Sequence, residues 1–514
     1  MRAMNRRDAC RVIAAAPLLG TSLTACGASN ASRRAIYSPS MPPREFRGVW
    51  VATVDNIDWP SQPGLSTLVQ KQEIDRILDE CLRLELNAIF LQVRPTCDAL
   101  YKSDNEPWSA FLTGSQGTAP NPQYDPLEYW VRGAHNRGID IHAWVNPFRA
   151  RHPKSVGPDS PSHVVNRHPD ITRDYRGHLW LDPGAPKSRE LAMGVIADLL
   201  NRYDIDGIHM DDYFYPYPDK DKPFPDDATF ADYKQNGGTL LRDDWRRDNI
   251  NQFVREVNEL VHRANPGRLF TISPFGIWRP GHPKQVVGFD AYAGLYADAK
   301  HWMQQGWCDA MIPQLYWKIE SKGQPFEPLL DWWTEQNTRD RHLWAGIYLT
   351  RIKPDNETGS SSWDSRDIID QIELVQRKSR EPGFALFSMV GMLENRRGIA
   401  DQLAAGPMSG PALVPESPWL NAPQPGTPRG SVEQVGAGYR LTLEPAAGPV
   451  PTRRYVAGFE QVAGKGSPGW VIPAGPGRIQ TNIIPTGQPN RNNVLSVVAI
   501  GPNGIAGGEL RFQM

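Results

Sequence analysis

The chain has 514 residues and a formal net charge of −1, from 56 basic and 57 acidic side chains. Outside the short N-terminal region, no basic run is longer than a pair such as Arg246-Arg247. Because nucleic-acid binding relies on clustered Lys and Arg, this balance argues against such a partner. The length is ample for a large barrel core and a second domain.

Residues 1–26 have the pattern of a cleavable export signal with a lipid attachment site. Arg6-Arg7 precede a mostly apolar run that is too short to cross a bilayer. Leu23-Thr-Ala-Cys26 resembles a bacterial lipoprotein box, which implies acylation of Cys26, and Gly27 resembles the pattern of outer-membrane retention. We therefore expect an envelope lipoprotein on the periplasmic face of the outer membrane. It would be exported by the Sec or the Tat route and carry a Ser-rich tether over 27–42.

Cysteine use predicts neither a disulfide framework nor a metal or cofactor site. Cys10 is lost with the signal and Cys26 is lipidated, so Cys81, Cys97 and Cys308 remain, an odd number that cannot all pair within one chain. Cys81 and Cys308 lack the spacing to His that a zinc site requires, and we expect them to be buried.

Strand-like and helix-like patterns alternate along residues 43–410. Strands are predicted over 47–54, 87–94, 139–146, 206–211, 268–275, 309–317, 342–349 and 384–389. Helices are predicted over 68–84, 126–136, 188–203, 243–264, 298–306, 326–336 and 365–380. This order is typical of an α/β fold, the (β/α)8 TIM barrel. A doubly wound open sheet is the alternative, but no Gly-rich phosphate turn follows the first strand.

Several of these strands turn a polar face toward the same rim. Side chains alternate across a strand, so Ile208 and Met210 share one face while His209 and Asp211 share the other. In a barrel the apolar face packs outward on helices, which sends His209 and Asp211 to the mouth where substrates bind. The alternative for an Asp before a turn is a helix N-cap. The same polarity recurs in other strands, at Arg94, His142, Asn146, Gln314 and Tyr316.

Three long segments, 96–124, 148–186 and 213–242, follow the C-terminal ends of their strands and are rich in Pro, Gly, Asp and aromatic residues. Such loops predict a cleft for an extended ligand. The chain has 17 Trp and 16 Tyr, and several fall at this rim, including Trp317. Aromatic rings stack on the apolar faces of sugars, although core packing is the alternative for each ring.

A linker over 411–430 is too rich in Pro for a helix or a central strand, and it separates the barrel from a second domain. Residues 431–514 contain short strand-like segments broken by Gly and Pro, which predict a small all-β sandwich. The run Val494 to Gly504 resembles the last hairpin of fibronectin type III domains. Because such a linker offers little interface, we expect the barrel to fold and work without the sandwich.

Short motifs follow one another along most of residues 44–405. They are Gly48-Val-Trp50, Asn56-Ile-Asp-Trp-Pro60, Gln92-Val-Arg-Pro95, Pro107-Trp108, Leu112-Thr-Gly114, His142-Ala-Trp-Val-Asn-Pro147, Asp206-Gly-Ile-His-Met-Asp-Asp-Tyr213, Tyr296-Ala-Asp298 and Pro313-Gln-Leu-Tyr-Trp317. Together they resemble glycosyl hydrolase-like family 10, a group of bacterial barrel lipoproteins. The resemblance implies glycoside hydrolysis, with bacterial cell-wall glycan strands of the peptidoglycan type as the substrate class.

Glycoside hydrolysis asks for two carboxyl groups that flank the scissile bond, one as acid and one as nucleophile or base. Asp211 is the first candidate, because its place five residues after Asp206 resembles the strand-four nucleophile of the α-galactosidase superfamily. That superfamily carries its acid after the sixth strand. Here the sixth strand ends in Gln314, Tyr316 and Trp317, so the partner of Asp211 does not follow from the resemblance.

The second carboxyl has several candidates. Asp298 either enters the cleft or caps the following helix. Glu320 and Glu394 also fall on the predicted catalytic side. Asp212 faces away from Asp211 by strand alternation, so we expect it to orient His209 or a loop.

Polar and aromatic residues at the barrel mouth are the expected substrate contacts. They are Arg94, His142, Asn146, Arg149, His209, Gln314, Tyr316 and Trp317. For Arg94 the alternative is a structural salt bridge with Asp211 or Asp55, because an inward arginine is costly unless paired. The missing carboxylate on the sixth strand also supports a second function, an inactive glycan-binding lipoprotein whose sandwich binds an envelope partner.

Overall fold

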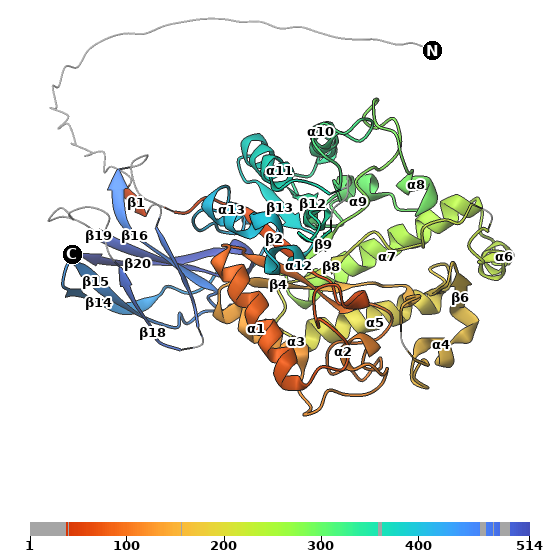
Figure 1. The fold of residues 1–514 in the computed structure, drawn as a ribbon, viewed down its shortest axis with the longest axis horizontal. Helices are drawn as coiled ribbons and strands as arrows, with labels where there is room; N and C mark the ends of the chain where they lie inside the picture. Colours follow the sequence, from red (N-terminus) through yellow and green to blue (C-terminus); the bar gives the residue numbers. More distant parts are fainter. Residues whose placement is uncertain are drawn as a thin grey trace, which may run out of the picture.

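The computed structural model describes residues 37–39, 41–155, 157–220, 222–357, 362–462, 469–475, 477–483 and 494–513. The expected export signal, the lipid site at Cys26 and most of the tether lie outside the described residues. Figure 1 shows two bodies joined end to end, a barrel wrapped by helices and a smaller body of strands. No helix in the described ranges is long and apolar enough to cross a membrane.

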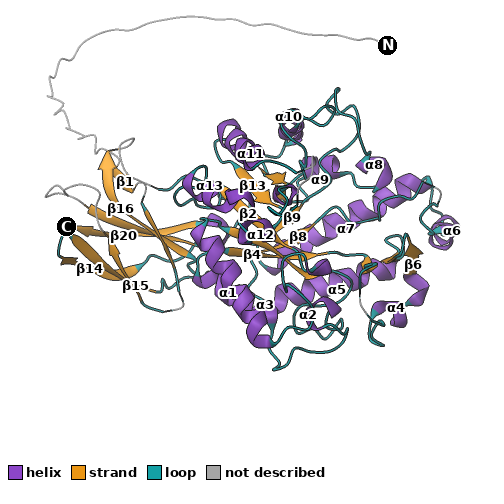
Figure 2. Cartoon of the chain, in the orientation of Figure 1, coloured by secondary structure: helices purple, strands orange, loops and turns teal. Residues whose placement is uncertain are grey.

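Parallel strands form the barrel (Figure 2). In chain order they are β2 (Phe46–Val51), β3 (Ala88–Arg94), β4 (Asp140–Val145), β8 (Gly207–Met210), β9 (Leu269–Ile272), β10 (Ala310–Met311), β11 (His342–Leu343), β12 (Ala345–Ile347) and β13 (Gly383–Leu386). β11 and β12 are two parts of one strand interrupted at Trp344, because β11 pairs with β10 and β12 pairs with β13. β13 also pairs with β2, which closes the sheet. The predicted (β/α)8 barrel is confirmed.

Amphipathic helices cover the outside of the barrel. The main ones are α1 (Thr67–Arg83), α3 (Pro126–Asn136), α5 (Pro186–Arg202), α7 (Arg242–Ala264), α9 (Ala299–Gln305), α10 (Phe326–Gln336) and α11 (Ser365–Lys378). Local signals set their starts. Asp125 accepts from the first backbone N–H groups of α3, where Pro126 fills the first position, and Asp364 and Asp367 form a capping box at α11. The sequence patterns therefore predicted these helices closely.

Apolar side chains fill a core on each side of the barrel wall. Outward residues such as Val49 and Ile208 pack against the helices. Inside, Phe46, Phe90 and Trp344 belong to a second cluster, in which the rings of Phe46 and Trp344 stack with centroids 3.5 Å apart. The base of the barrel is thus a packed core, and in such barrels ligands bind at the other end, where the strands finish.

Two excursions enlarge the end at which the barrel strands finish. After β4 come β5 (Arg149–Arg151), α4 (Val164–Arg167), β6 (Thr172–Tyr175) and β7 (His178–Leu181), whose strands form a small sheet in the order β5-β7-β6. After β8 comes α6 (Asp227–Gln235). Figure 1 shows α4, β6 and α6 at the end of the barrel far from the smaller body.

The smaller body consists of antiparallel sheets. One contains β14 (Arg429–Val435), β15 (Gly438–Glu444) and β18 (Ile479–Ile483), and the other contains β16 (Arg454–Val462), β17 (Trp470–Pro473), β19 (Val494–Ile500) and β20 (Ala506–Gln513). Leu441 and Ile483 of the first sheet share a core with Tyr455 and Val497 of the second. The predicted all-β sandwich is confirmed, while its fibronectin type III character stays a prediction.

The end of the predicted tether belongs to this sandwich. β1 (Tyr37–Pro39) pairs antiparallel with β16 at residues 460–462, beyond the part of β16 that β17 covers. Strand addition there satisfies backbone groups that an open edge would leave unpaired. Met41 then packs against the cluster that contains Leu413. Residues 37–39 and Met41, at the end of the predicted tether, therefore contact the rest of the chain.

The sandwich docks tightly onto the base of the barrel, although we expected little interface. Arg453 donates to Asp206 at 3.1 Å and to Asp204 at 3.0 Å. The backbone N–H of Asn503 donates to Asp140 at 3.1 Å. These acids lie at or just before the starts of β4 and β8, opposite the rim, and the buried ones need partners. The sandwich therefore supplies polar contacts that the barrel base uses.

The linker also packs against the barrel. Leu413 and Val414 are buried, and Val414 joins the cluster inside the barrel base. The indole of Trp419 donates to Asp309 at 2.8 Å. Proline density prevented regular structure here, as predicted, but it did not prevent close packing.

Candidate active site

A cavity of about 390 Å³ opens at the carboxyl ends of the barrel strands. We call it the main cavity. It is lined by Trp50, Ala52, Val54, Asp55, Ile57, Gln92, Trp144, Arg149, His152, Lys154, Asp211, Asp212, Tyr213, Tyr217, Ser273, Gln314, Tyr316, Tyr348 and Phe387. The carboxyl ends of the strands are where ligands of such barrels bind. The lining includes three carboxylic acids, Asp55, Asp211 and Asp212.

Three donors hold the buried carboxyl of Asp211. Its Oδ2 accepts from the indole of Trp144 at 3.1 Å and from Nδ2 of Asn146 at 2.7 Å. Its Oδ1 accepts from the backbone N–H of Tyr213 at 3.0 Å. Hydrogen bonds to a carboxylate stabilise its charged form. Asp211 is thus fixed at the mouth, as the sequence predicted.

Asn146 connects Asp211 to a second layer of polar groups. Its Oδ1 accepts from Nε2 of Gln92 at 2.6 Å and from a guanidinium nitrogen of Arg149 at 2.7 Å. The Arg149 guanidinium also faces the ring of Tyr213, at 5.1 Å from its centroid. This network orients the amide so that its NH₂ points at Asp211.

Asp212 lines the same cavity as Asp211, so the expectation that it faces away is wrong. The physical reason is that β8 ends at Met210, and strand alternation does not continue into the turn. Asp212 accepts hydrogen bonds from the hydroxyl of Tyr217 and from Nε2 of Gln314, the latter at 3.2 Å. Its described partners do not include His209, which we had expected it to orient.

Burial and hydrogen bonding set the two carboxyls apart. Burial and the charge of Asp211 raise the pKa of Asp212 to about 7. Burial also raises the pKa of Asp211, but the charge of Arg149 and the three hydrogen bonds oppose the rise. Two neighbouring acids share their protons as a pair. Arg149 and the three donors favour the ionised form of Asp211, so Asp212 is the carboxyl of the pair that more readily keeps a proton.

Asp55 is a cavity acid that sequence reasoning did not select for chemistry. It stands in the turn after β2, has a left-handed backbone conformation with φ 57°, and pairs with Nζ of Lys154 at 2.5 Å. Its position shortly after the first strand was the available signal. The ion pair with Lys154 bridges two loops across the mouth.

Aromatic rings form one wall of the main cavity. The rings of Tyr316 and Tyr348 lie 4.6 Å apart, Phe387 lies 5.8 Å from Tyr348, and Trp50 lies 6.1 Å from Phe387. Sequence reasoning identified Tyr316 but missed Tyr348 and Phe387, although both follow barrel strands. A wall of this kind suits the apolar face of a sugar.

The predicted binding residues divide into those that reach the cavity and those that do not. Arg149, Gln314 and Tyr316 line it. Asn146 does not line the cavity, but it donates a hydrogen bond to Asp211, which does. The other predicted contacts, which are Arg94, His142, His209 and Trp317, lie outside its lining.

Arg94 is a structural residue. It forms an ion pair with Glu106 at 2.5 Å and donates to the carbonyl of Asn146 at 2.6 Å. The salt-bridge alternative was therefore right in kind, but its partner is neither Asp211 nor Asp55. A fully buried guanidinium needs such partners to be tolerated.

The two barrel histidines lie in the interior layer below the cavity. The indole of Trp50 donates to Nε2 of His209 at 2.9 Å, and His209 packs on Phe90 with ring centroids 4.2 Å apart. Burial lowers the pKa of His142 to about 4 and holds the pKa of His209 well below its usual value, so both imidazoles are neutral near neutral pH. Trp317 packs edge-on against Phe275 instead of entering the cavity.

The other candidates for the second carboxyl do not line the main cavity. Asp298 caps α9, accepting from the backbone N–H of His301, and also accepts from the indole of Trp278 at 3.0 Å. Glu320 is exposed, and Glu394 pairs with Arg396 at 2.7 Å. For Asp298 the helix-cap alternative is the one that the structure adopts.

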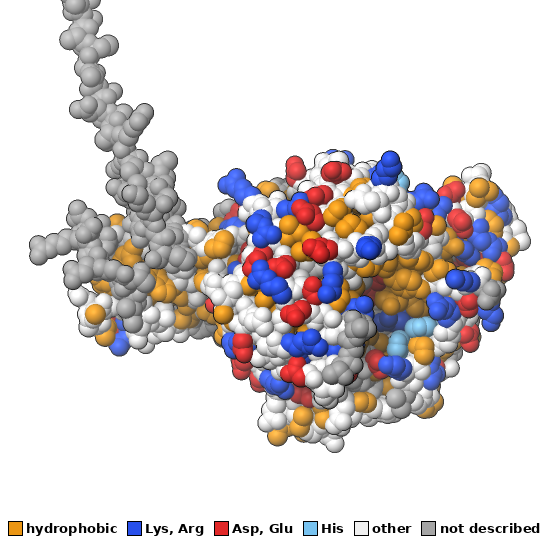
Figure 3. Space-filling view, turned by 45° about the horizontal axis from the view of Figure 1, so that its top comes forward, with side chains coloured by type: hydrophobic (Ala, Val, Ile, Leu, Met, Phe, Trp, Pro, Cys, Tyr) orange, Lys and Arg blue, Asp and Glu red, His pale blue; other side chains and the backbone are white. Residues whose placement is uncertain are grey.

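A smaller hollow of about 270 Å³ adjoins the main cavity, and we call it the side hollow. It is lined by Arg149, His152, Tyr175, Arg176, His178, Trp180, Tyr213, Pro216 and Tyr217. Four of these residues, Arg149, His152, Tyr213 and Tyr217, also line the main cavity. The space-filling view shows histidine and basic side chains gathered beside a hydrophobic surface on one face of the barrel (Figure 3).

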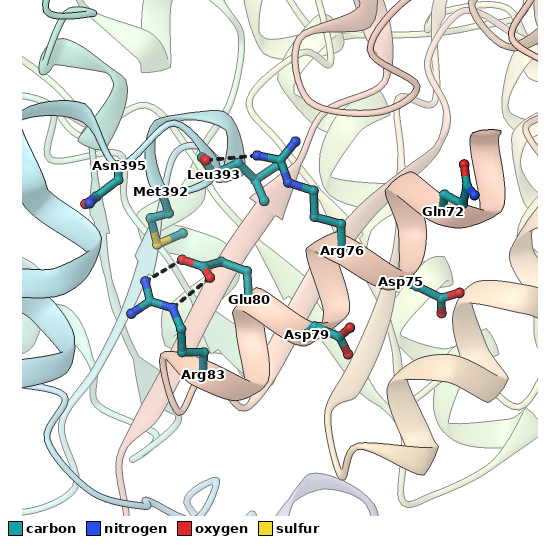
Figure 4. A pocket seen from close by; sticks show the side chains of 9 residues that line it. All are labelled: Gln72, Asp75, Arg76, Asp79, Glu80, Arg83, Met392, Leu393 and Asn395. Atoms are coloured by element: carbon teal, nitrogen blue, oxygen red, sulfur yellow. Dashed lines mark hydrogen bonds and ion pairs between the residues drawn. The ribbon is translucent and has the colours of Figure 1, made fainter.

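A third hollow lies on the outside of the barrel between α1 and α12 (Met389–Leu393). In it Glu80 turns toward Arg83, and Arg76 donates to the carbonyl of Leu393 (Figure 4). Its charged groups largely satisfy one another at the surface, so it offers little to a ligand.

Comparison with known proteins agrees with the geometry. Residues 45–364 match the family described as glycosyl hydrolase-like 10. The chain is 39% identical over 394 residues to Glycosyl hydrolase YngK of Bacillus subtilis (strain 168), which covers 75% of this chain and 76% of that protein. It is 33% identical over 368 residues to Glycosyl hydrolase DigH of Escherichia coli (strain K12), covering 65% and 82%.

Among solved structures, the PgaB (BpsB) glycoside hydrolase domain of Bordetella bronchiseptica aligns with a TM-score of 0.46 and 12% identity, over 70% of this chain and 98% of that one. The family match covers well over half of the chain, and both named relatives exceed the identity at which a common family is secure. This chain therefore belongs to the glycosyl hydrolase-like 10 family.

Proposed function

We propose that the chain hydrolyses glycosidic bonds of a bacterial cell-wall glycan in the main cavity. The observation that carries this proposal is the pair of buried carboxyls, Asp211 and Asp212, which line one cavity and have different partners: Arg149 and three donors favour ionised Asp211, whereas burial and the charge of Asp211 raise the pKa of Asp212. Glycoside hydrolysis needs a protonated acid and a carboxylate at the same pH. This pair supplies both.

Asp212 acts as the general acid in this mechanism. Its proton passes to the glycosidic oxygen as the bond from that oxygen to the sugar carbon breaks. The hydroxyl of Tyr217 and the amide of Gln314 then stabilise the carboxylate that remains. Asp211 is ionised and stabilises the positive charge that develops on the sugar ring. Water then adds to the sugar carbon and gives its proton to the carboxylate pair, which restores the protonated acid.

The substrate class rests on the shape of the site and on the motif resemblance. The wall of Tyr316, Tyr348 and Phe387 suits sugar rings, and the two joined hollows suit more than one sugar unit. Long loops at the carboxyl ends of the strands favour an extended ligand. A cell-wall glycan satisfies these requirements and agrees with the expected export.

We also propose that the protein is an envelope lipoprotein anchored through Cys26. The support comes from the lipoprotein box and from β1, which lies beside the strands of the sandwich, at the end of the molecule opposite α4, β6 and α6 (Figure 1). An anchor there would leave the cavity free to face the glycan. Replacing Cys26 by Ser should abolish lipid labelling and release the protein from membrane fractions, and unchanged retention would contradict the proposal.

An inactive glycan-binding lipoprotein is the alternative function. Its support was the missing carboxylate after the sixth strand, but Asp212, which follows β8 as Asp211 does, supplies a second cavity carboxyl. Incubation with purified cell-wall glycan, with and without stem peptides, separates the two functions. Release of soluble saccharides supports hydrolysis, whereas co-sedimentation without release supports binding alone.

A further inference from the structure

We propose that the side hollow binds the carboxylate of an acidic sugar in the same glycan chain that the main cavity cleaves. This inference rests on the proposed function, because it assumes that the glycan chain runs from the side hollow into the main cavity. The binding itself requires no hydrolysis. The side hollow and main cavity share Arg149, His152, Tyr213 and Tyr217, so a sugar in one is adjacent to a sugar in the other.

The lining of the side hollow is basic. It contains the guanidinium groups of Arg149 and Arg176 and the imidazoles of His152 and His178, and it contains no Asp or Glu among its described residues. The acids that face it lie in the main cavity. Asp211 is near Arg149, and Asp55 pairs with Lys154 and lies near His152. The side hollow therefore offers hydrogen-bond donors and positive charge, and its lining contains no carboxylate that would neutralise that charge.

Arg176 is held in place over the side hollow. It lies in the turn between β6 and β7, with φ 55°, and its Nη1 donates to the carbonyls of Tyr217 and Pro218 at 3.3 Å and 3.2 Å. In the part of the chain that the structure describes, its hydrogen bonds involve this one nitrogen. The guanidinium is thus positioned with a donor edge that can pair with a carboxylate.

The two imidazoles add donors without adding charge. Burial and the nearby Arg149 lower the pKa of His152 to about 4 and also lower that of His178. The rings meet edge to face at 5.3 Å, and Nδ1 of His178 is buried without a hydrogen-bond partner among the described residues. An anion in the side hollow would supply that missing interaction by accepting a hydrogen bond from the neutral ring.

The charge balance favours a carboxylate over a phosphate. Arg149 already shares its charge with Asp211 and donates to Asn146, which leaves Arg176 as the main uncompensated cation. Neutral histidines do not balance a second negative charge. A monoanion therefore matches the side hollow, and a sugar can carry one either as a carboxylated ether substituent or as a uronic acid.

Binding to the full chain tests this inference in the Asp212→Asn background, which removes turnover. The probes are disaccharides that carry N-acetylmuramic acid or glucuronic acid, each compared with its analogue in which the carboxyl is reduced to an alcohol. Titration calorimetry should show about tenfold tighter binding of at least one acid over its alcohol, as expected for one charge-assisted contact. The acid that shows the preference identifies the source of the carboxylate.

Two arginine variants provide the specificity control. Arg176→Gln should bring the ratio of acid to alcohol affinity toward one, whereas Arg167→Gln removes an exposed arginine of the same excursion and should leave the ratio unchanged. Equal affinity for acid and alcohol, an equal loss for both in Arg176→Gln, or tighter binding of a sugar phosphate would each overturn the inference. None of these outcomes depends on catalysis, so they are distinguishable from failure of the proposed function.

Discussion

Asp211 and Asp212 are consecutive in the chain and line the same cavity, yet their carboxyls bond to different partners. Asp211 accepts from Trp144, Asn146 and the backbone of Tyr213, whereas Asp212 accepts from Tyr217 and Gln314. Because β8 ends before them, the chain turns and both side chains can face the mouth. This relationship places an acid and a carboxylate together without a contribution from another strand.

Replacing either carboxyl should nearly abolish hydrolysis. We expect Asp212→Asn and Asp211→Asn each to lower kcat by about 100- to 10,000-fold, because the first removes the proton donor and the second removes the charge that stabilises the transition state. Amides keep the shape of the carboxyls, so glycan binding should persist. Initial rates of saccharide release and co-sedimentation measure the two effects.

Asp298→Asn is the matched control for these variants. Asp298 caps α9 outside the main cavity, so its replacement should leave kcat within about twofold and affect stability only slightly, since Asn also caps helices. A loss of activity in this variant as large as that in Asp212→Asn would show that the second carboxyl had been misassigned.

The rate should fall on the alkaline side near neutral pH. The pKa of Asp212 is raised to about 7 by burial and by Asp211, so the acid is protonated below this value and loses its proton above it. We expect kcat to drop about tenfold for each further pH unit once Asp212 is ionised. On the acid side activity should fall as Asp211 takes up a proton. A pH-rate profile on soluble glycan fragments checks both limbs.

Tyr217→Phe should move the alkaline limb in a defined direction. The Tyr217 hydroxyl stabilises ionised Asp212, so its removal should raise the pKa of Asp212 and shift this limb to higher pH. A structural defect alone would lower the rate without moving the limb. A shift to lower pH would contradict the assignment of Asp212 as the acid.

The periodic parts of the fold could be predicted from the sequence. α3 and α10 have the predicted bounds because apolar spacing and Pro or Asp at their starts agree with one another. The barrel order followed from alternation of such segments. The short length of β10 and the break at Trp344 could not be predicted. Hydrogen bonding to the neighbouring strands, and not the side-chain pattern, decides where a strand ends.

The site was predicted in part, for reasons that differ among its residues. Asp211 and Asn146 were found because they follow strands directly. His142 and His209 were misplaced because alternation gives the face of a strand but not the depth along the barrel. Asp212 was misplaced because β8 ends two residues before it, where alternation no longer decides the facing of a side chain.

The aromatic wall should act mainly on substrate binding. Tyr348 contacts both Tyr316 and Phe387 in the wall, so Tyr348→Leu removes a ring from the sugar-facing surface while keeping an apolar side chain. We expect KM to rise about tenfold with a smaller change in kcat, since stacking contacts serve substrate and transition state alike. A fall confined to kcat, measured on the same glycan fragments, would argue against this assignment.

The interface at the barrel base gives the last prediction, which reverses the expectation of an independent barrel. Arg453 is buried, with 5% of its surface exposed. It pairs with Asp206, which is 1% exposed. Burial alone would raise the pKa of Asp206, but Arg453 and His135 hold it below its usual range. This pairing therefore stabilises the fold above the usual pKa of Asp and is lost as pH falls.

Arg453→Met should therefore destabilise the protein by about 3–5 kcal/mol, because it leaves the buried charge of Asp206 with fewer partners. Arg440→Met is the matched control, since Arg440 is an exposed arginine of the same sandwich and should change stability little. Adding Asp206→Asn to Arg453→Met should restore part of the loss by removing the orphaned charge. Truncation before Leu413 should destabilise the barrel more than any of these substitutions, because it also exposes the barrel base to water. Thermal melting of the full chain and of each variant measures these differences, and a truncated barrel that melts like the full chain would contradict them.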